Sequence, residues 1–471
     1  MAPWELGVGE AAAAIRTGAL TAEELTEILL ARVAANTELN AFIAVDGDMV
    51  RAAARAADRV RAGGGTLPAL HGVPLALKDN LDTIALPTTG GTPGLKSNRP
   101  KRDAAVVEKL LAAGALVLGK CNLHELAYGI TSNNAAFGPV RNPYAPSRIA
   151  GGSSGGTAAA VAARLAPGGI GSDTGGSVRI PAALCGIVGF RPTTGHWPQP
   201  GIVPISHTRD TAGPMTRSVA DCALLDAVVC GSAAPLAAIA PKGLRLGVPR
   251  RHFWEDLDRE LETICEAALR RFREAGVELV DVDLGEVARL DGAAGFPIAL
   301  HETVTDLNRY LADHGSALDF AGLAARVASP DVRAILHGLS GAGAIPETAY
   351  REALDKQRPA LQEAYRRSFR DHGIAALVFP TTPAPAAALG DDETFSLNGA
   401  ARPTFATFIR NCSPGSVAGI PGLSLPAGLT AAGLPLGIEL DGPAGADSEV
   451  LAVGTALEPL LPRLPPPALG A

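Results

Sequence analysis

The sequence predicts an α/β protein whose central sheet is covered by helices. Short apolar runs such as residues 73–77 are typical of buried strands, and they alternate with amphipathic segments such as residues 25–33. Such alternation is typical of a sheet core with helices packed on it. The chain has 471 residues, of which 47% are hydrophobic and 19% are charged, so it can bury a large core.

The first elements can be placed from local signals. Residues 21–24 (TAEE) have the spacing of a capping box and predict a helix that continues into residues 25–33. A second helix is expected through residues 49–61, and the strand at 73–77 carries Lys78 at its end. Further helices are expected at 104–113, 157–165, 256–275, 300–313 and 346–372, and further strands at 116–118, 244–248, 277–282, 375–379 and 423–426.

Composition and charge argue against several classes of protein. The net charge of −7 argues against a dedicated nucleic-acid surface, and no run approaches the roughly 18–20 apolar residues that a membrane span needs. The N-terminus lacks the basic and apolar regions of a secretory signal. The six cysteines are scattered without a C-x-x-C pair, which favours a reducing compartment over a disulfide framework or a zinc site. We therefore expect a cytoplasmic protein that binds neither nucleic acid nor membrane.

Two loops rich in glycine and serine carry the strongest functional signal. Residues 151–156 (GGSSGG) are followed by residues 172–177 (SDTGGS), and Lys78 lies 75 residues before Ser153. Glycine lets the backbone come close to a reacting group and adopt angles that other residues avoid. Two such loops with hydroxyl groups, together with an amine that can act as a base, indicate a site for acyl transfer.

Three other interpretations of these loops remain open. Ser153 lies in a G-x-S-x-G pattern, the nucleophile elbow of α/β-hydrolases, which needs an acid and a histidine further along the chain. Seven histidines follow, but none lies in a motif-like setting, and this interpretation gives Lys78 no role. Residues 169–175 resemble a phosphate-binding G-x-G-x-x-G loop with one residue too many. The third interpretation is a pair of tight turns, which would explain one glycine pair better than two Ser-Gly loops.

A zinc site is not expected near the first loop. His124 and Glu125 begin an H-E-x-x-H pattern, but position 128 is Tyr, so the second histidine ligand is missing. His124 is expected to be a packed, hydrogen-bonded residue, and Cys185 a small buried one. The sequence therefore predicts neither a metal nor an organic cofactor.

The glycine-rich centre closely resembles the amidase signature family. The resemblance spans residues 5–460 and includes the lysine motif that leads from Gly72 to Lys78. It is carried by GGSSGG at 151–156, DTGGSVRIPA at 173–182, CGIVGFRPT at 185–193 and GIPGLSLPAG at 419–428.

The resemblance implies a single α/β/α domain over residues 1–471, built on a large mixed β-sheet. Its signature core would cover about residues 66–220, between an N-terminal helical region at about 1–65 and a tail at about 461–471. It implies an amidohydrolase that cleaves linear C–N amide bonds of a small molecule without a cofactor, as a monomer or homodimer. The A subunit of a glutamine-dependent tRNA amidotransferase is an alternative, although the loop at residues 128–134 is unlike the one in that subunit.

The resemblance also implies a catalytic set of three residues. Ser177 corresponds to the nucleophile, Ser153 to a serine with a cis peptide bond that relays a proton, and Lys78 to the base. A serine hydroxyl is a poor nucleophile until its proton is removed, and a lysine that is neutral because it is buried can remove that proton.

The same family resemblance implies residues that support the catalytic set. Asp173 and Arg179 would brace the second loop, and Ser154 would hydrogen-bond near Lys78. Backbone N–H groups would stabilise the oxyanion of the tetrahedral intermediate. These groups would come from Thr174, Gly175, Gly176 and Ser177.

An apolar pocket is expected beside the first loop. Residues 124–134 and 204–211 are similar to those of the indoleacetamide and mandelamide hydrolase branch, which implies neutral aryl-bearing amides as substrates, with anilides, carbamates and esters as further candidates. Arg209 is the exception, because a guanidinium there would instead recruit an acidic substrate. The expected pocket residues are Tyr128, Gly129, Ile130 and Thr131, with Phe137, Trp197 and Ile202 as further apolar candidates.

Overall fold

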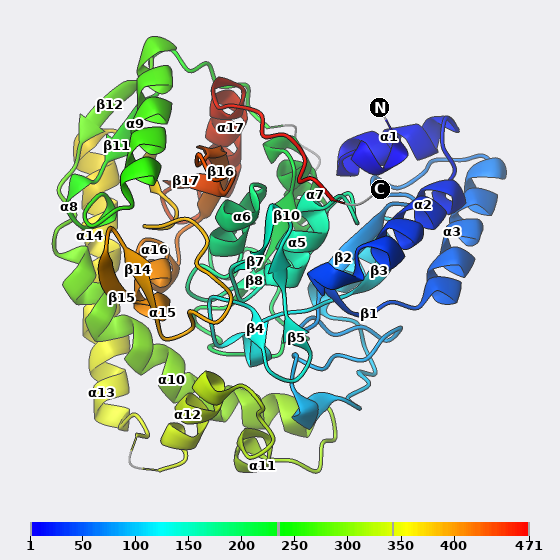
Figure 1. Ribbon diagram of the computed structural model, residues 1–471, viewed down its shortest axis with the longest axis horizontal. Coiled ribbons are helices and arrows are strands. Elements are labelled where there is room, and N and C mark those ends of the chain that lie inside the picture. The colour runs from blue at the N-terminus through cyan, green and yellow to red at the C-terminus, as the bar shows by residue number, and fades with distance from the viewer. Residues whose placement is uncertain (1, 233–235, 342, 470–471) are drawn as a thin grey trace.

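The computed structural model describes residues 2–232, 236–341 and 343–469 (Figure 1). Its centre is an eleven-stranded sheet that takes strands from both ends of the chain. The strands lie in the order β1 (Phe42–Ala44), β3 (Leu116–Cys121), β2 (Pro74–Lys78), β8 (Gly169–Asp173), β10 (Thr211–Thr216), β9 (Val188–Arg191), β16 (Gly422–Leu429), β17 (Pro435–Asp441), β13 (Ala376–Pro380), β11 (Arg245–Val248) and β12 (Glu278–Asp281).

The sheet is mixed, which confirms the predicted fold class. The pairs β2–β3, β2–β8, β11–β12 and β11–β13 are parallel, and the other neighbours are antiparallel. Three two-stranded ribbons lie outside it. They pair β4 (Asn133–Asn134) with β5 (Gly138–Pro139), β6 (Arg141–Asn142) with β7 (Ala145–Ile149), and β14 (Thr394–Leu397) with β15 (Ala400–Pro403).

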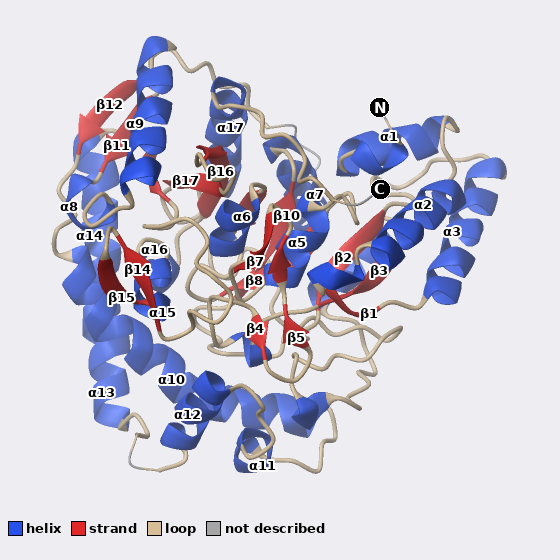
Figure 2. Cartoon of the chain, viewed as in Figure 1, coloured by secondary structure: helices blue, strands red, loops and turns tan. Residues whose placement is uncertain are grey.

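Helices pack along the sheet from one end of the molecule to the other (Figure 2). Among the described residues, none of them combines the length and apolar character that crossing a membrane requires. The helices are α1 (Val8–Thr17), α2 (Ala22–Ala35), α3 (Gly47–Ala62), α4 (Ala105–Ala112), α5 (Gly155–Ala162), α6 (Arg179–Cys185), α7 (Val219–Cys230), α8 (Arg250–Phe253), α9 (Arg259–Glu274), α10 (Val287–Asp313), α11 (Phe320–Ala324), α12 (Pro330–Leu339), α13 (Glu347–Glu352), α14 (Arg358–His372), α15 (Thr404–Ile409), α16 (Ser413–Ala418) and α17 (Asp447–Leu457).

Local signals placed most of these elements correctly. The capping box is present at the start of α2, where Thr21 Oγ1 accepts from the Glu24 N–H at 3.0 Å and the Glu24 carboxylate accepts from the Thr21 N–H at 2.8 Å. The main difference is α10, which begins at Val287 rather than near residue 300. Glycines and Pro297 lower the helix propensity of its first half, and tertiary packing holds that half helical despite them.

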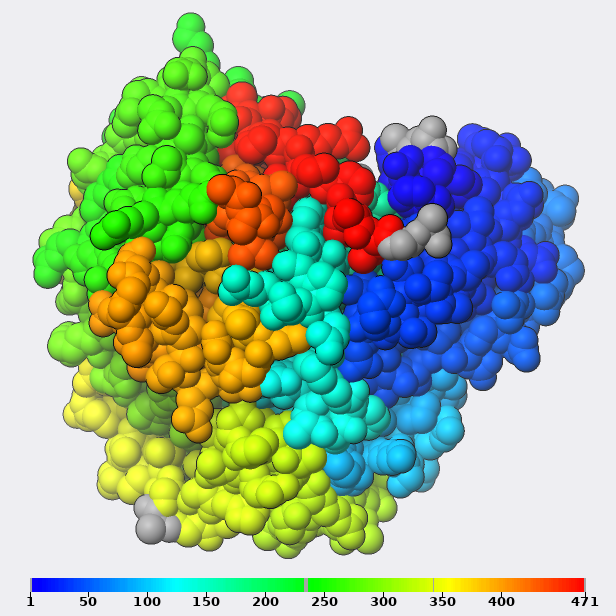
Figure 3. Space-filling view, in the orientation of Figure 1, coloured from blue at the N-terminus to red at the C-terminus, as the bar shows by residue number. Residues whose placement is uncertain are grey.

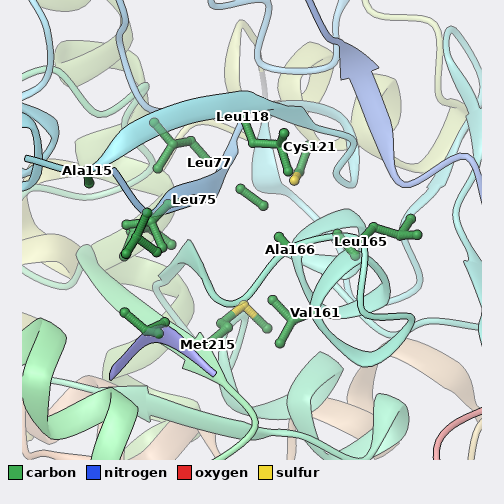
Figure 4. Packing of buried hydrophobic residues seen from close by; sticks show 14 of the residues in the cluster. Leu75, Leu77, Ala115, Leu118, Cys121, Val161, Leu165, Ala166 and Met215 are labelled. Carbon is green, nitrogen blue, oxygen red and sulfur yellow. The ribbon is translucent and has the colours of Figure 1, made fainter. Parts of the chain in front are cut away.

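Helix α5 is the element that brings the two Ser-Gly loops together. Every one of its residues is buried, and its small side chains allow close packing against β2 and β8. A Cβ atom at Gly156 would lie 2.3 Å from the carbonyl oxygen of Asn122, so only glycine fits there. Figure 4 shows the apolar packing around it, where Val161 of α5 and Met215 of β10 face Leu75 and Leu118 of the neighbouring strands.

The parallel pairing of β2 and β8 sets the position of the predicted site. Leu77 pairs with Ile170, so the two strands end side by side and carry Lys78 and Asp173 to the same edge of the sheet. Ser153 and Ser154 lie at the start of α5, which packs against both strands. The lysine and both loops therefore meet at one place.

Candidate active site

Lys78 lies at the centre of a buried set of hydroxyl groups. Its Nζ donates to Ser153 Oγ at 2.7 Å and to Ser172 Oγ at 2.8 Å. Asn80 Nδ2 also donates to Ser172 Oγ, at 2.9 Å. Ser172 and Asn80 were not predicted as site residues, although Ser172 begins the second Ser-Gly motif. The arrangement gives Lys78 two hydroxyl partners and Ser153 a direct contact with the amine.

The first loop turns sharply before α5. The peptide bond between Gly152 and Ser153 is cis, which is the conformation that the family resemblance implies for this serine. Ser154 links the two loops: its Oγ donates to the carbonyl oxygen of Ser172 at 3.1 Å and accepts from the Ser172 N–H at 3.2 Å. Ser154 therefore acts near Lys78 by holding Ser172 in place.

Burial shifts the protonation equilibrium of Lys78 toward the neutral amine. The side chain is completely inaccessible to solvent, and burial lowers its pKa to about 7, against the raising influence of Asp173 and Asp210. A lysine with this pKa is neutral in a large fraction of molecules at neutral pH. A neutral amine that contacts a hydroxyl oxygen can accept its proton.

The second loop is shaped by Asp173. Its carboxylate accepts from the N–H of Gly176 at 2.8 Å and from the N–H of Val178 at 3.1 Å. It also pairs with Arg179 Nε at 3.1 Å and with Arg191 Nη1 at 3.0 Å. Burial favours the neutral acid, but the two guanidinium groups hold the pKa of Asp173 well below its usual range. Asp173 and Arg179 brace the loop as expected, and Arg191 is an additional partner.

The predicted oxyanion hole needs one correction. The N–H of Gly176 already donates to Asp173, so it is not free to bind an oxyanion in this structure. Gly176 instead has φ of +128°, and a Cβ there would lie 2.6 Å from Cys412 Cβ, so its role is to let the loop turn. Among the described residues, no acceptor pairs with the N–H of Thr174, Gly175 or Ser177, which leaves these three as donors.

Arg179 extends the buried charge network into the C-terminal part of the chain. It pairs with Glu439, donates to Ser416 Oγ at 2.6 Å and lies 3.8 Å from Asp441. Burial and the neighbouring Glu439 raise the pKa of Asp441 well above its usual value. No sequence signal links these partners to Arg179, because they lie more than 200 residues further along the chain.

Ser177 separates this polar interior from a pocket. Ser153 and Lys78 are completely buried, whereas Ser177 is 9% exposed and lines the pocket. In the described part of the chain, no hydrogen bond joins Ser177 Oγ to Ser153. Ser177 is nevertheless tied to the first loop, because its carbonyl oxygen accepts from the N–H of Ser154 at 3.2 Å.

The pocket is formed by segments that are far apart in the sequence. Figure 3 shows the segments near residues 120–150, 320–340 and 385–410 side by side on one face of the molecule. Tyr128, Gly129 and Ile130 line the pocket as predicted, and they are joined by Thr174, Gly175 and Ser177. Arg209, which was expected near the pocket, also lines it. The other lining residues were not predicted: Ala127, Ile205, Asp291, Gly295, Phe296, Ala299, Leu300, Ile335, Phe405, Ile409 and Ser413.

Four residues expected at the pocket do not line it. Thr131 turns toward His124, with Oγ1 3.4 Å from Nδ1, and Trp197 is buried and donates from Nε1 to Asp226 Oδ1 at 2.8 Å. Ile202 packs in the hydrophobic core. Phe137 lies in the turn between β4 and β5, where its carbonyl oxygen accepts from Asn40 at 2.7 Å. Apolar character alone therefore did not separate pocket residues from core residues.

Arg209 has a structural role in the pocket wall. Its Nη1 donates to the carbonyl oxygen of Gly295 at 2.6 Å, and its Nη2 donates to the carbonyl oxygen of Thr174 at 2.9 Å. Burial lowers its pKa to about 10, so it remains charged at neutral pH. Both terminal nitrogens thus hold backbone groups, and one of these groups lies in the loop of Ser177.

Asp291 is the acidic group of the pocket. Its Oδ1 accepts from Ser413 Oγ at 2.9 Å. Burial raises its pKa to about 6, against the lowering influence of Arg209 and Ser413. Among the described residues its second carboxylate oxygen has no hydrogen-bond donor, so this oxygen is available to a ligand.

The histidine–glutamate pair of the H-E-x-x-Y segment stabilises the fold. His124 Nε2 contacts Asp331 Oδ2 at 2.8 Å, and Glu125 accepts from the N–H groups of Ala328 and Ser329. Tyr128 at the end of this segment hydrogen-bonds to Thr303 through its hydroxyl at 2.6 Å. These contacts join residues 124–128 to helices α10 and α12.

Comparisons with known proteins agree with this geometry. The amidase family model matches residues 24–451. The chain is 46% identical to an indoleacetamide hydrolase of Agrobacterium vitis, over 92% of each protein, and 42% identical to a mandelamide hydrolase of Pseudomonas putida, over 98% of this chain and 93% of the relative. A crystal structure of an amidase superposes with a TM-score of 0.87 at 34% identity, over 97% of this chain and 100% of that one. The chain belongs to the amidase family and is a hydrolase of amide bonds.

Proposed function

We propose that this protein hydrolyses neutral, aryl-bearing carboxamides through an acyl-enzyme on Ser177. The observation that carries the proposal is the position of Ser177 between a buried lysine–serine pair and an apolar pocket. The named activities of the relatives, on indoleacetamide and mandelamide, agree with an aryl group on the acyl side of the bond.

The first half of the reaction forms an ester and releases ammonia. Ser177 Oγ attacks the amide carbon and gives its proton to Ser153 Oγ, while Ser153 gives its own proton to neutral Lys78. The oxyanion accepts hydrogen bonds from the free N–H groups near Ser177. When the intermediate collapses, the proton returns from Lys78 through Ser153 to the leaving nitrogen, and ammonia departs. The contact between Ser177 and Ser153 that this needs would form when substrate binds.

The second half uses the same groups on water. A water molecule attacks the ester carbon of the acyl-enzyme and loses a proton through Ser153 to Lys78. Collapse of the second intermediate returns that proton to Ser177 Oγ and releases the carboxylic acid. Ser177, Ser153 and Lys78 thereby return to their starting protonation states, and the proposed reaction uses no cofactor.

The pocket favours an aromatic acyl group. Tyr128 forms part of one wall, and Phe296 and Phe405 face each other with ring centroids 6.1 Å apart. Phe296 is 52% exposed, and together with Phe405 it offers an open apolar surface that an aryl ligand can cover. Burying an aryl ring against these side chains gains roughly 25 cal/mol per Å².

Asp291 would add a preference for an acyl group with an N–H donor. Its free carboxylate oxygen is ionised in most molecules at neutral pH, because its pKa is about 6. A buried acceptor left without a donor costs free energy, so a ligand that supplies an N–H is favoured over one that does not. The indole ring of indoleacetamide carries such a group.

Two other functions have less support. A nucleophile elbow at Ser153 requires a histidine partner, whereas the side-chain partner of Ser153 in the described residues is Lys78. Recruitment of an acidic substrate by Arg209 is less favoured because Asp291 lines the same pocket and partly balances its charge, and because two of its N–H groups already hold backbone carbonyls. Wider leaving-group tolerance, toward anilides, carbamates and esters, remains part of the proposal, as does action by the chain alone as a monomer or homodimer.

The test is a substrate panel with the purified chain. We expect kcat/KM to be highest for indole-3-acetamide, mandelamide and phenylacetamide, and at least tenfold lower for malonamic acid and glutamine. An acetanilide, an aryl carbamate and an aryl ester test the leaving-group range. Higher efficiency on the charged amides would overturn the aryl proposal, and no hydrolysis without a second protein would favour the tRNA amidotransferase subunit.

A further inference from the structure

Three side chains outside the pocket point their donor atoms at one place. His196 lies in the loop after β9, and Asp226 and Cys230 lie one turn apart near the end of α7. The i, i+4 spacing puts the carboxylate and the thiol on the same face of the helix. The loop then brings the imidazole against that face, and the three donor atoms lie within 4.8 Å of one another.

The distances between these atoms are close to those of a metal site. His196 Nε2 lies 3.0 Å from Cys230 Sγ and 3.2 Å from Asp226 Oδ1, and the sulfur and the oxygen are 3.7 Å apart. Zinc binds imidazole nitrogen at ~2.0–2.1 Å, thiolate sulfur at ~2.3 Å and carboxylate oxygen at ~2.0–2.2 Å in tetrahedral geometry, which places neighbouring ligand atoms roughly 3.3–3.6 Å apart. The three observed distances bracket that range.

Protein hydrogen bonds hold these three groups together when no ion is bound. His196 Nε2 carries at most one hydrogen, and it lies close to both a sulfur and a carboxylate oxygen. Asp226 Oδ1 also accepts from Trp197 Nε1, and the Cys230 thiol can donate to His196 Nε2 or to Asp226 Oδ1, so each group has a partner before an ion binds. A cation at the centre would interact with all three atoms at once.

We propose that His196, Asp226 and Cys230 bind a thiophilic divalent transition-metal ion such as zinc, with a water molecule as the fourth ligand. The site is open to solvent: the His196 side chain is 31% exposed, and Cys230 is half-buried whereas the other five cysteines are buried. A hydrogen bond from Trp197 Nε1 to Asp226 Oδ1, at 2.8 Å, fixes the orientation of the Asp226 carboxylate. Such outer hydrogen bonds to a ligand are typical of protein metal sites.

A second group of possible ligands, His207, Glu302 and Asp306, contains no thiol, and its Glu302 is already fully hydrogen-bonded. Glu302 Oε2 already accepts from Ser206 and Thr208, and its Oε1 accepts from Tyr350. These carboxylate oxygens are already occupied by protein donors. The group around Cys230 is therefore the better metal site, and the group around His207 provides a comparison.

The bound ion would fasten the loop after β9 to α7. This loop begins just after Arg191, which contacts Asp173, and continues to Arg209 in the pocket wall. None of the three ligands lines the pocket, so the ion would act on the stability of the fold rather than on the chemical step. Because the ion binds the folded chain, saturating metal should raise the melting temperature.

Cobalt titration tests the site directly. We expect Co²⁺ to bind the reduced protein with one-to-one stoichiometry at this site, to produce a thiolate-to-cobalt charge-transfer absorption band, and to quench tryptophan fluorescence through the adjacent Trp197. Zn²⁺ should displace Co²⁺ and raise the melting temperature. A chelator should reverse both effects while leaving amide hydrolysis within twofold of its starting rate.

Matched variants assign the ligands. Cys230→Ser and His196→Gln should each lose the absorption band and weaken Zn²⁺ binding at least tenfold, while amide hydrolysis by each shows that it is folded. His337→Gln removes an exposed histidine on α12, and His207→Gln alters the comparison group; both should keep the band. Absence of the band in the unmodified protein, or the same band in Cys230→Ser, would overturn the proposal.

Discussion

The interior around Lys78 and the pocket beyond Ser177 meet at one residue but are built in opposite ways. The interior consists of fully buried polar groups, and the side-chain hydrogen bonds of Lys78 and Ser154 are made within two loops and the strand that carries Lys78. The pocket is mostly apolar, opens to solvent at Phe296, and draws residues from six segments that are separate in the sequence. The comparison teaches that the chemistry is specified locally, whereas substrate selection is specified by packing between distant helices.

The largest expected effect is the loss of Ser177. Ser177→Ala should lower kcat by about 10⁴-fold or more, because no covalent intermediate can form. Lys78→Ala and Ser153→Ala should also be severe, and a double variant should cost far less than the two single losses combined. Steady-state kinetics measures these effects, with Ser340→Ala as an exposed control. Near-normal activity of Ser177→Ala together with loss in Ser153→Ala would make Ser153 the nucleophile.

The next largest effect concerns the network behind the loop. Asp173→Asn should lower the free energy of unfolding by about 3–5 kcal/mol, because two buried guanidinium groups lose their charged partner. Thermal or denaturant unfolding measures the loss. The matched surface variant Asp48→Asn should change the free energy of unfolding little, since the ion pair that it removes, between Asp48 and Arg51, is exposed. Equal small losses in both variants would show that the loop does not depend on the buried network.

The pH dependence of kcat/KM distinguishes the interior from the pocket, because each contains one group with a pKa near neutrality. Lys78 must be neutral to act, so kcat/KM should fall about tenfold per unit below its pKa of about 7 and level off above it. Asp291, with a pKa of about 6, is the competing explanation. In Asp291→Asn the fall near pH 7 should persist. Its disappearance in that variant would assign the titration to the pocket.

The smallest expected effect is selectivity within the pocket. The unmodified protein should prefer indole-3-acetamide over its 1-methyl analogue by about tenfold, the value of one hydrogen bond to a charged acceptor. In Asp291→Ala the ratio should fall to near one, while phenylacetamide is still hydrolysed. Comparing kcat/KM for the two indoles measures this. An unchanged ratio in Asp291→Ala would remove Asp291 from substrate recognition without affecting the aryl proposal.

The same contrast explains what the sequence predicts. The Ser-Gly loops, the lysine strand and α5 carry local signals, and the family resemblance assigns Lys78, Ser153 and Ser177 to one site, so the contact between Lys78 and Ser153 could be anticipated. Ser172 was missed although it lies within the second motif. The pocket residues from α10 and α15 carry no local signal of proximity to Ser177, because nothing in a segment such as residues 291–300 indicates which surface it will face.

The predicted roles of individual residues that proved wrong also depended on contacts between distant or folded segments, which local sequence does not reveal. The backbone N–H of Gly176 is used by Asp173, a contact that the motif alone does not reveal. Trp197 and Ile202 are as apolar as true pocket residues, but they lie in the core. Apolar character predicts burial, and only the packed structure separates burial against protein from burial against a ligand.

The most direct test of the account is to trap the acyl-enzyme. The protein is mixed with a nitrophenyl ester of an arylacetic acid, whose acylation step is faster than hydrolysis of the intermediate, and the reaction is stopped with acid. Mass spectrometry of the digested protein should find the arylacetyl group on Ser177, and no such adduct in Ser177→Ala. Attachment of the group to Ser153 would contradict the account.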